Sequence, residues 1–70
     1  MRKELIKYRG ERTQEQMAKM YGVTQQVWSL WERGKQKPDI IKMKRLEVDS
    51  GVPMERLFFD VFDNAGLSNI

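Results

Sequence analysis

The chain has 70 residues, 40% of them hydrophobic and 33% charged, with a formal net charge of +3 and a sequence pI near 9.5. This length predicts one domain with a small core, and the basic balance favours an anionic partner. Because the sequence contains neither cysteine nor histidine, it excludes disulfides, ordinary zinc sites and a Ser-His-Asp arrangement. No apolar run approaches the ~20 residues that span a bilayer. We therefore expect a cytoplasmic protein that is not an enzyme and uses no metal, cofactor or small-molecule ligand.

The first predicted helix covers residues 2–9, with Leu5 and Tyr8 three positions apart on its inner face. Gly10 follows as a stop signal. The second helix is expected directly after Thr13, because a glutamine stands three residues further on and completes a capping box.

A short turn separates the second helix from the third. Gly22 supplies the positive φ that ends a helix, and Thr24 is the next N-cap, so the third helix runs to about Arg33. At about 100° per residue, Trp28 and Trp31 share one side of this helix and are assigned to the core. So short a turn makes the two helices cross steeply. This is the geometry of a helix-turn-helix, whose second helix enters the DNA major groove.

The opposite side of the third helix carries four polar side chains, Gln25, Gln26, Ser29 and Arg33. A glutamine amide can donate and accept together, which matches adenine, and an arginine can donate twice to guanine. An ordinary solvated surface is the alternative for the glutamines, and Arg33 lies late enough on the helix to fall outside the groove. Inside a capped helix-turn-helix, we prefer contact with bases or phosphates.

Two further helices complete the expected domain, which covers residues 1–62. The fourth begins after Pro38 and Asp39 and is expected to point three apolar side chains inward, Ile40, Met43 and Leu46. Its cations, Lys42, Lys44 and Arg45, are interpreted as a solvated face, with Lys42 preferred among them as a contact to the DNA backbone. The fifth helix begins near Pro53, and residues 63–70 are expected to form a flexible tail.

The stretch from Thr13 to Pro38, TQEQMAKMYGVTQQVWSLWERGKQKP, resembles the lambda-repressor-like or Cro-like helix-turn-helix family, also called XRE. The resemblance implies a compact, all-α domain of five helices, in which the second and third form the helix-turn-helix. It implies that Gln14 contacts a DNA phosphate and that the loop from Lys35 to Lys37 follows the DNA backbone. The residues that it places toward the groove are Thr24, Gln25, Gln26, Ser29 and Leu30.

The expected DNA contacts divide into two sets. Base contacts are expected from Gln25, Gln26, Ser29, Leu30 and Arg33. Phosphate contacts are expected from Gln14, Thr24, Lys35, Gln36, Lys37 and Lys42, although a lysine after a helix also simply favours the helix dipole. Leu30 departs from the family pattern, because an apolar side chain can touch a thymine methyl but cannot donate a hydrogen bond.

Two other departures concern structure rather than contact with DNA. The segment before Thr13 is shorter than usual in the family, which leaves open the cation that pairs with Glu32 in the family pattern. Arg9 is the preferred partner and Lys7 the second choice. We expect a structural ion pair that ties the first helix to the third. Glu47 and Ser50 replace residues that relatives keep small or apolar, so the fourth helix is expected to be shifted or loosened.

Two classes of function fit these observations. The leading one is a sequence-specific transcriptional regulator of the phage or mobile-element repressor type, which occupies an operator in double-stranded DNA. The alternative uses the same fold as a protein-interaction module or antitoxin-like component, through the apolar residues Met20, Val27 and Leu30.

The end of the domain predicts self-association. Five residues there carry more apolar surface than one short helix can bury, Leu57, Phe58, Phe59, Val61 and Phe62. We therefore expect a homodimer that forms through this segment and places two recognition helices about one DNA turn apart. The alternative is a monomer in which Phe59 or Phe62 folds back on its own core.

Overall fold

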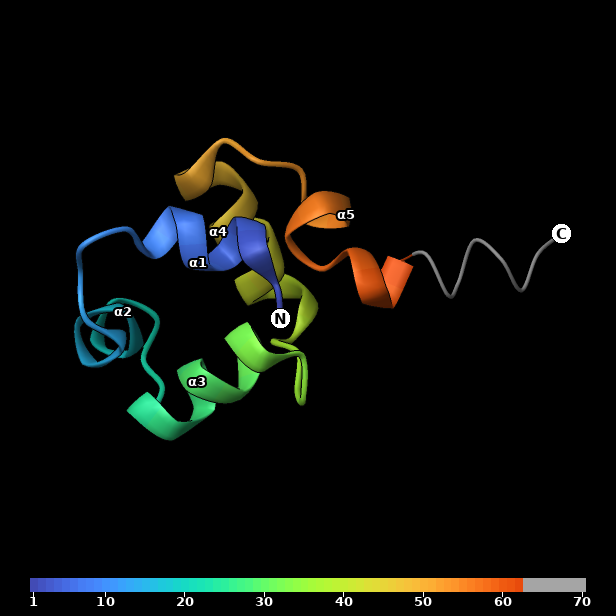
Figure 1. Cartoon of the computed structure of the whole chain (residues 1–70). Helices are drawn as coiled ribbons and strands as arrows, with labels where there is room; N and C mark the ends of the chain where they lie inside the picture. Colours follow the sequence, from blue (N-terminus) through green and yellow to red (C-terminus); the bar gives the residue numbers. More distant parts are fainter. Residues whose placement is uncertain (63–70) are drawn as a thin grey trace, which may run out of the picture.

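The computed structural model describes residues 1–62, and the expected tail at residues 63–70 lies outside them. The described chain is all-helical, which confirms the predicted fold class (Figure 1). A further helical turn at residues 59–62 follows the fifth helix. The five helices are α1 (Lys3–Arg9), α2 (Gln14–Met20), α3 (Gln25–Arg33), α4 (Ile40–Ser50) and α5 (Met54–Leu57).

Local signals place the helix-turn-helix where the sequence predicts it. Thr13 Oγ1 accepts a hydrogen bond from the Gln16 N–H at 3.0 Å, and Gln16 Oε1 accepts one from the Thr13 N–H at 2.8 Å. Thr24 Oγ1 accepts from the Val27 N–H at 3.1 Å, and Gly22 has a φ of 68°. These caps satisfy N–H groups that a helix start leaves without partners. Helices α2 and α3 pack against each other, and α2 lies on the opposite side of the molecule from α5 (Figure 1).

The core forms between the inner faces of all five helices. Trp28 is fully buried and stacks on Tyr21, with ring centroids 5.7 Å apart, while Trp31 lies beside it and is also buried. Ala18 is buried where α2 approaches α3. The remaining buried apolar side chains are those of Leu5, Met17, Met43, Leu46, Leu57 and Phe58.

One core assignment on α4 is wrong. Ile40 was expected to face inward, but 63% of its surface is exposed. The buried side of α4 is centred between Met43 and Leu46, and at 100° per residue Ile40 falls beyond its edge. Ile41 and Val48 are exposed as well, so α4 presents an apolar strip to solvent.

The expected loosening of α4 is also wrong. The helix runs unbroken over 11 residues, because the polar residues near its end find partners. Glu47 Oε2 accepts from the Met54 N–H at 2.9 Å, and Ser50 Oγ accepts from the Val52 N–H at 3.0 Å. These bonds connect α4 to the start of α5.

Arg45 is more than a solvated cation. Its guanidinium lies 4.8 Å from the centre of the Tyr21 ring and donates to the Met20 carbonyl at 3.1 Å. The Tyr21 hydroxyl in turn donates to Asp49 Oδ2 at 2.8 Å and lies 2.8 Å from the Tyr8 hydroxyl. Arg45 and this hydrogen-bonded chain hold α4 against the end of α2.

Candidate nucleic-acid interface

The N-terminal half of α3 presents polar side chains to solvent. Thr24, Gln25 and Gln26 are exposed, and Ser29 and Leu30 are half-buried. Within residues 1–62, the side chains of Gln25 and Gln26 form no hydrogen bond. The Thr24 hydroxyl accepts the Val27 N–H, which leaves its own proton free to donate to an outside oxygen. Among the residues that the structure describes, this end of α3 therefore faces outward with unused donors and acceptors.

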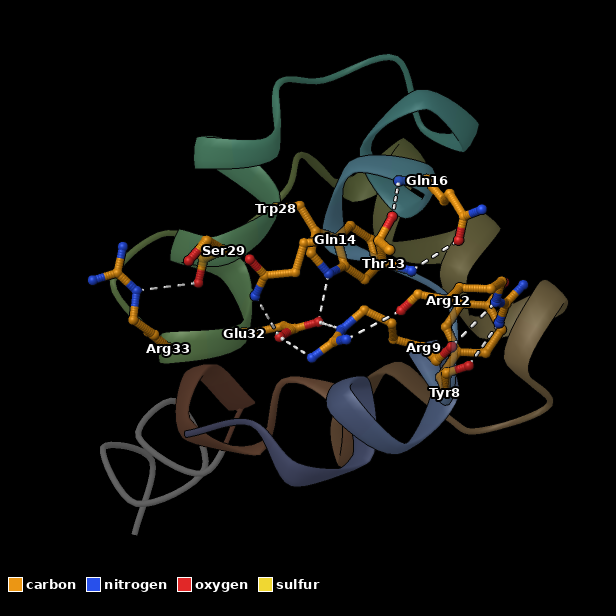
Figure 2. Close-up of polar contacts among 10 residues, drawn as sticks. All are labelled: Tyr8, Arg9, Arg12, Thr13, Gln14, Gln16, Trp28, Ser29, Glu32 and Arg33. Atoms are coloured by element: carbon orange, nitrogen blue, oxygen red, sulfur yellow. Dashed lines mark hydrogen bonds and ion pairs between the residues drawn. The ribbon is translucent and has the colours of Figure 1, made fainter.

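Arg33 lies at the other end of α3 and is exposed. Its Nε donates to the Ser29 carbonyl at 3.4 Å, and its side chain points away from the buried polar groups (Figure 2). The terminal nitrogens have no partner within the described chain, so they remain available to an anion. This geometry leaves contact with a base and contact with a phosphate equally open.

Glu32 lies on the inner side of α3 with only 2% of its surface exposed, and its carboxylate accepts several hydrogen bonds. Three side chains converge on its carboxylate in Figure 2. Arg9 donates from Nε at 2.6 Å, Gln14 from Nε2 at 2.9 Å and Trp28 from Nε1 at 2.5 Å. Burial by itself raises the pKa of Glu32, but these hydrogen bonds outweigh it and hold the pKa below its ordinary value. The carboxylate therefore stays charged and ties α1 and α2 to α3.

The structure contains the expected ion pair between Arg9 and Glu32, while Lys7 is exposed. Arg12 explains how Arg9 is oriented, because its carbonyl accepts from Arg9 Nη1 at 3.1 Å. Gln14 is less available to a phosphate than expected, because its side-chain amide donates one hydrogen bond to Glu32. Only the second amide proton is left for a phosphate oxygen.

The loop after α3 carries the cations expected to follow the DNA backbone. Gly34 adopts the left-handed conformation that ends α3, and Lys35, Gln36 and Lys37 are all exposed. The N–H groups of Lys35 and Gln36 both donate to the Leu30 carbonyl, at 2.9 and 3.3 Å. These bonds hold Lys35 and Gln36 immediately beyond the C-terminal end of α3, and Lys37 follows them in the chain.

Lys42 is less available than these loop lysines. It is half-buried, and its Nζ lies 3.3 Å from Asp39 Oδ2. The same Asp39 caps α4 by accepting from the Lys42 N–H at 2.8 Å. A phosphate would have to compete with this carboxylate.

Arg2 is the functional candidate that the sequence analysis missed. Its guanidinium is buried and donates to both carboxylate oxygens of Asp60 at 2.9 Å. Nη1 donates to the Trp31 carbonyl at 2.7 Å and to the Gln36 carbonyl at 2.5 Å. No local pattern signals this contact, because Arg2 and Asp60 lie 58 positions apart.

The expected dimer surface needs a correction. Leu57 and Phe58 have no exposed surface, so their side chains pack within the chain and are not available to a partner. Val61 and Phe62 are partly buried against the same core, which agrees with the alternative in which Phe62 folds back. Phe59 remains, with 47% of its surface exposed.

Comparison with models of known protein families assigns the chain to a family. A family model described as helix-turn-helix matches residues 3–57, which covers every helix from α1 to α5. No curated protein and no solved structure matches the chain. Within residues 1–62, no helix is long and apolar enough to cross a membrane.

Proposed function

The chain belongs to the lambda-repressor-like, or XRE-type, helix-turn-helix family, and we propose that it recognises a specific operator in double-stranded DNA. Membership makes the protein a DNA-binding regulator in general terms. The proposal adds that α3 reads bases in the major groove. It also adds that the protein acts in the cytoplasm as a repressor, of the type that phages and mobile elements use.

The observation that supports this proposal most directly is the availability of the Gln25 and Gln26 side-chain amides. Both side chains are exposed at the start of α3 and have no hydrogen bond within residues 1–62. The first residues of a recognition helix are those that reach base edges. An amide without an internal partner can bond adenine N6 and N7 together. Ser29, Leu30 and Arg33 extend the same surface toward the end of the helix.

The residues around this helix supply contacts that carry no sequence information. Lys35 and Lys37 lie in the exposed loop beyond α3, where the sugar-phosphate backbone is in reach. Gln36 in the same loop, the second amide proton of Gln14 and the Thr24 hydroxyl are further donors. Lys42 is the weakest candidate, because Asp39 already accepts from it.

We also propose a homodimer, with Phe59 at its centre and the exposed parts of Val61 and Phe62 around it. Phe59 is a large apolar side chain that is nearly half exposed. A two-fold dimer would present two recognition helices to two half-sites. Sedimentation of the protein across a concentration series tests this assembly, and a strict monomer that binds a single half-site contradicts it.

Selection from a pool of random DNA duplexes tests the main proposal. We expect a recurring site, because unpaired amides and an arginine distinguish adenine and guanine edges. Titration of the selected duplex at several salt concentrations should then show steep weakening, since binding releases condensed counterions. Failure to enrich any site would contradict sequence-specific recognition. Absence of binding even at low salt would contradict DNA binding by this surface.

A protein-interaction or antitoxin-like role is the second candidate. The observation in its favour is exposed apolar surface, on Met20 beside the helix-turn-helix and on Ile41 and Val48 of α4. Val27 and Leu30, which were expected to share this role, are half-buried. Failure of the DNA selection, with the protein folded, would move this candidate ahead.

A further inference from the structure

Arg2 joins segments that are far apart in the sequence. Besides its side-chain bonds to Asp60, Trp31 and Gln36, its backbone N–H donates to the Glu32 carbonyl at 2.7 Å. The N-terminus therefore lies against the end of α3. The same guanidinium lies 5.0 Å from the centre of the Phe58 ring. One side chain thus connects the last turn of α3, the loop that follows it and the final helical turn.

The chemistry of this contact depends on a planar guanidinium. Two nitrogens face the Asp60 carboxylate in a bidentate pair, while the third donates to two backbone carbonyls. A lysine has a single nitrogen on a flexible stem, so it cannot hold all of these acceptors in place. Only 3% of the Arg2 surface is exposed, and loss of Asp60 would leave its charge without a carboxylate partner.

The carbonyl of Gln36 lies between the two lysines expected to contact DNA. Arg2 holds this carbonyl, and Asp60 holds Arg2. Asp60 is also close to the loop itself, because a Cβ at Gly34 would lie 4.0 Å from Asp60 Oδ2. The path from Asp60 to the loop therefore consists of two consecutive hydrogen-bonded contacts.

We infer that Arg2 and Asp60 form a positioning pair, which holds the loop from Gly34 to Lys37 in the conformation that grips DNA phosphates. Neither residue is assigned a contact with DNA. This inference rests on the proposed DNA-binding function. It assigns part of the binding strength to an acidic residue in the helical turn at residues 59–62.

Because Asp60 is negatively charged, the direction in which its removal changes the affinity for DNA tests the inference. If Asp60 acted only through its field, removing a negative charge near two lysines would strengthen binding to DNA. If Asp60 positions the loop, the same change weakens binding and releases fewer counterions. Glu4→Gln is a matched control, because Glu4 also pairs with an arginine, Arg56 at 3.5 Å, and its loss changes the net charge equally.

The test compares Asp60→Asn with Glu4→Gln on the selected duplex across a salt series. Asp60→Asn should lower affinity and reduce the slope of log affinity against log salt by about one to two, as expected when two lysines lose their phosphates. Glu4→Gln should leave the slope unchanged and the affinity equal or higher. An Asp60→Asn affinity and slope equal to those of Glu4→Gln would overturn the inference.

Amide hydrogen exchange tests the positioning without DNA. In Asp60→Asn, the amides of Lys35 and Gln36 should exchange faster, whereas the capped amides of Gln16 and Val27 should not change. Unchanged exchange at Lys35 and Gln36 would overturn the inference even if the wild-type protein bound no duplex. If Asp60→Asn does not fold, Arg2→Lys replaces it. This variant keeps the positive charge but loses the two guanidinium nitrogens that face Asp60. The same two measurements then support or overturn the inference.

Discussion

The two ends of α3 are held by different kinds of interaction. At its start, Thr24 provides one neutral cap, and the glutamines that follow are exposed and unpaired within residues 1–62. At its end, the buried Glu32 carboxylate binds Arg9, and the Trp31 carbonyl binds Arg2. The charged, buried contacts therefore lie at the C-terminal end of the helix, away from Gln25 and Gln26.

The C-terminal end of α3 therefore contributes to the stability of the fold, and its N-terminal end is the part proposed to contact bases. A side chain that is bonded inside the protein cannot offer the same group to DNA, so the exposed start keeps its donors and acceptors free. The Thr24 cap alone would not fix the direction of α3, because it bonds only within the helix. We expect the C-terminal end of α3, which Arg9 and Arg2 hold, to orient the exposed N-terminal end, and the following predictions test this expectation.

Glu32→Ala should have the largest effect on stability. It removes the carboxylate that Arg9, Gln14 and Trp28 share and leaves a half-buried arginine without its partner. We expect the free energy of unfolding to fall by about 3–5 kcal/mol, measured by urea denaturation. Glu11→Ala, at an exposed position, is the control and should change it by less than about 0.5 kcal/mol. Equal effects of the two variants would show that the hydrogen bonds to Glu32 do not stabilise the fold.

Acid should weaken the contacts at the C-terminal end of α3 in a defined pH range. The pKa of Glu32 is lowered in the fold, so its stabilising contribution is complete above its ordinary pKa of about 4.5 and is lost as the pH falls through the lowered value. The free energy of unfolding should therefore decline below about pH 4.5. Arg9→Gln should make this decline shallower, because the pKa of Glu32 rises when its cation is removed. An equally steep decline in Arg9→Gln would show that other carboxyl groups control acid unfolding.

Gln26→Ala should affect recognition and leave the fold intact. We expect a loss of about 1–3 kcal/mol on the selected duplex, with binding to unrelated duplexes nearly unchanged. Competition between specific and random DNA measures both quantities. The paired variant Lys35→Ala should instead weaken all duplexes alike and reduce the salt slope by about one. If Gln26→Ala weakened specific and random duplexes equally, the start of α3 would not be the base-reading element.

Thr24→Ala should destabilise the fold much less than Glu32→Ala does. It removes the cap of α3, which costs about 1 kcal/mol of unfolding free energy. Thermal unfolding of Thr24→Ala and Thr24→Ser gives the comparison, because serine keeps the capping oxygen. A loss as large as that of Glu32→Ala would mean that both ends hold α3 equally.

The sequence predicted the parts of the fold that depend on neighbouring residues. The capping box at Thr13, the turn at Gly22 and the burial of both tryptophans involve spacings of three or four residues, which local chemistry determines. The pairing of Arg9 with Glu32 was expected from the family resemblance, in which Glu32 pairs with a cation. The DNA contacts themselves remain predictions.

Contacts between distant segments escaped the sequence analysis. Nothing near Asp60 in the chain indicates Arg2 as its partner, because the two residues lie 58 positions apart. Ile40 fits the apolar spacing of α4, yet its exposure depends on which side of that helix meets the core. Glu47 appeared to weaken α4 because its partner, the Met54 N–H, belongs to the next helix. In each case the decisive atom lies on another element.

The two tryptophans in the core are intrinsic fluorophores that both belong to α3. The chain contains only these two indoles, and both are buried on the inner face of this helix. One indole N–H bonds the Glu32 carboxylate, so its emission responds to the ionisation and position of that group. Intrinsic fluorescence should therefore follow α3 specifically, during acid titration or duplex binding, without any attached dye.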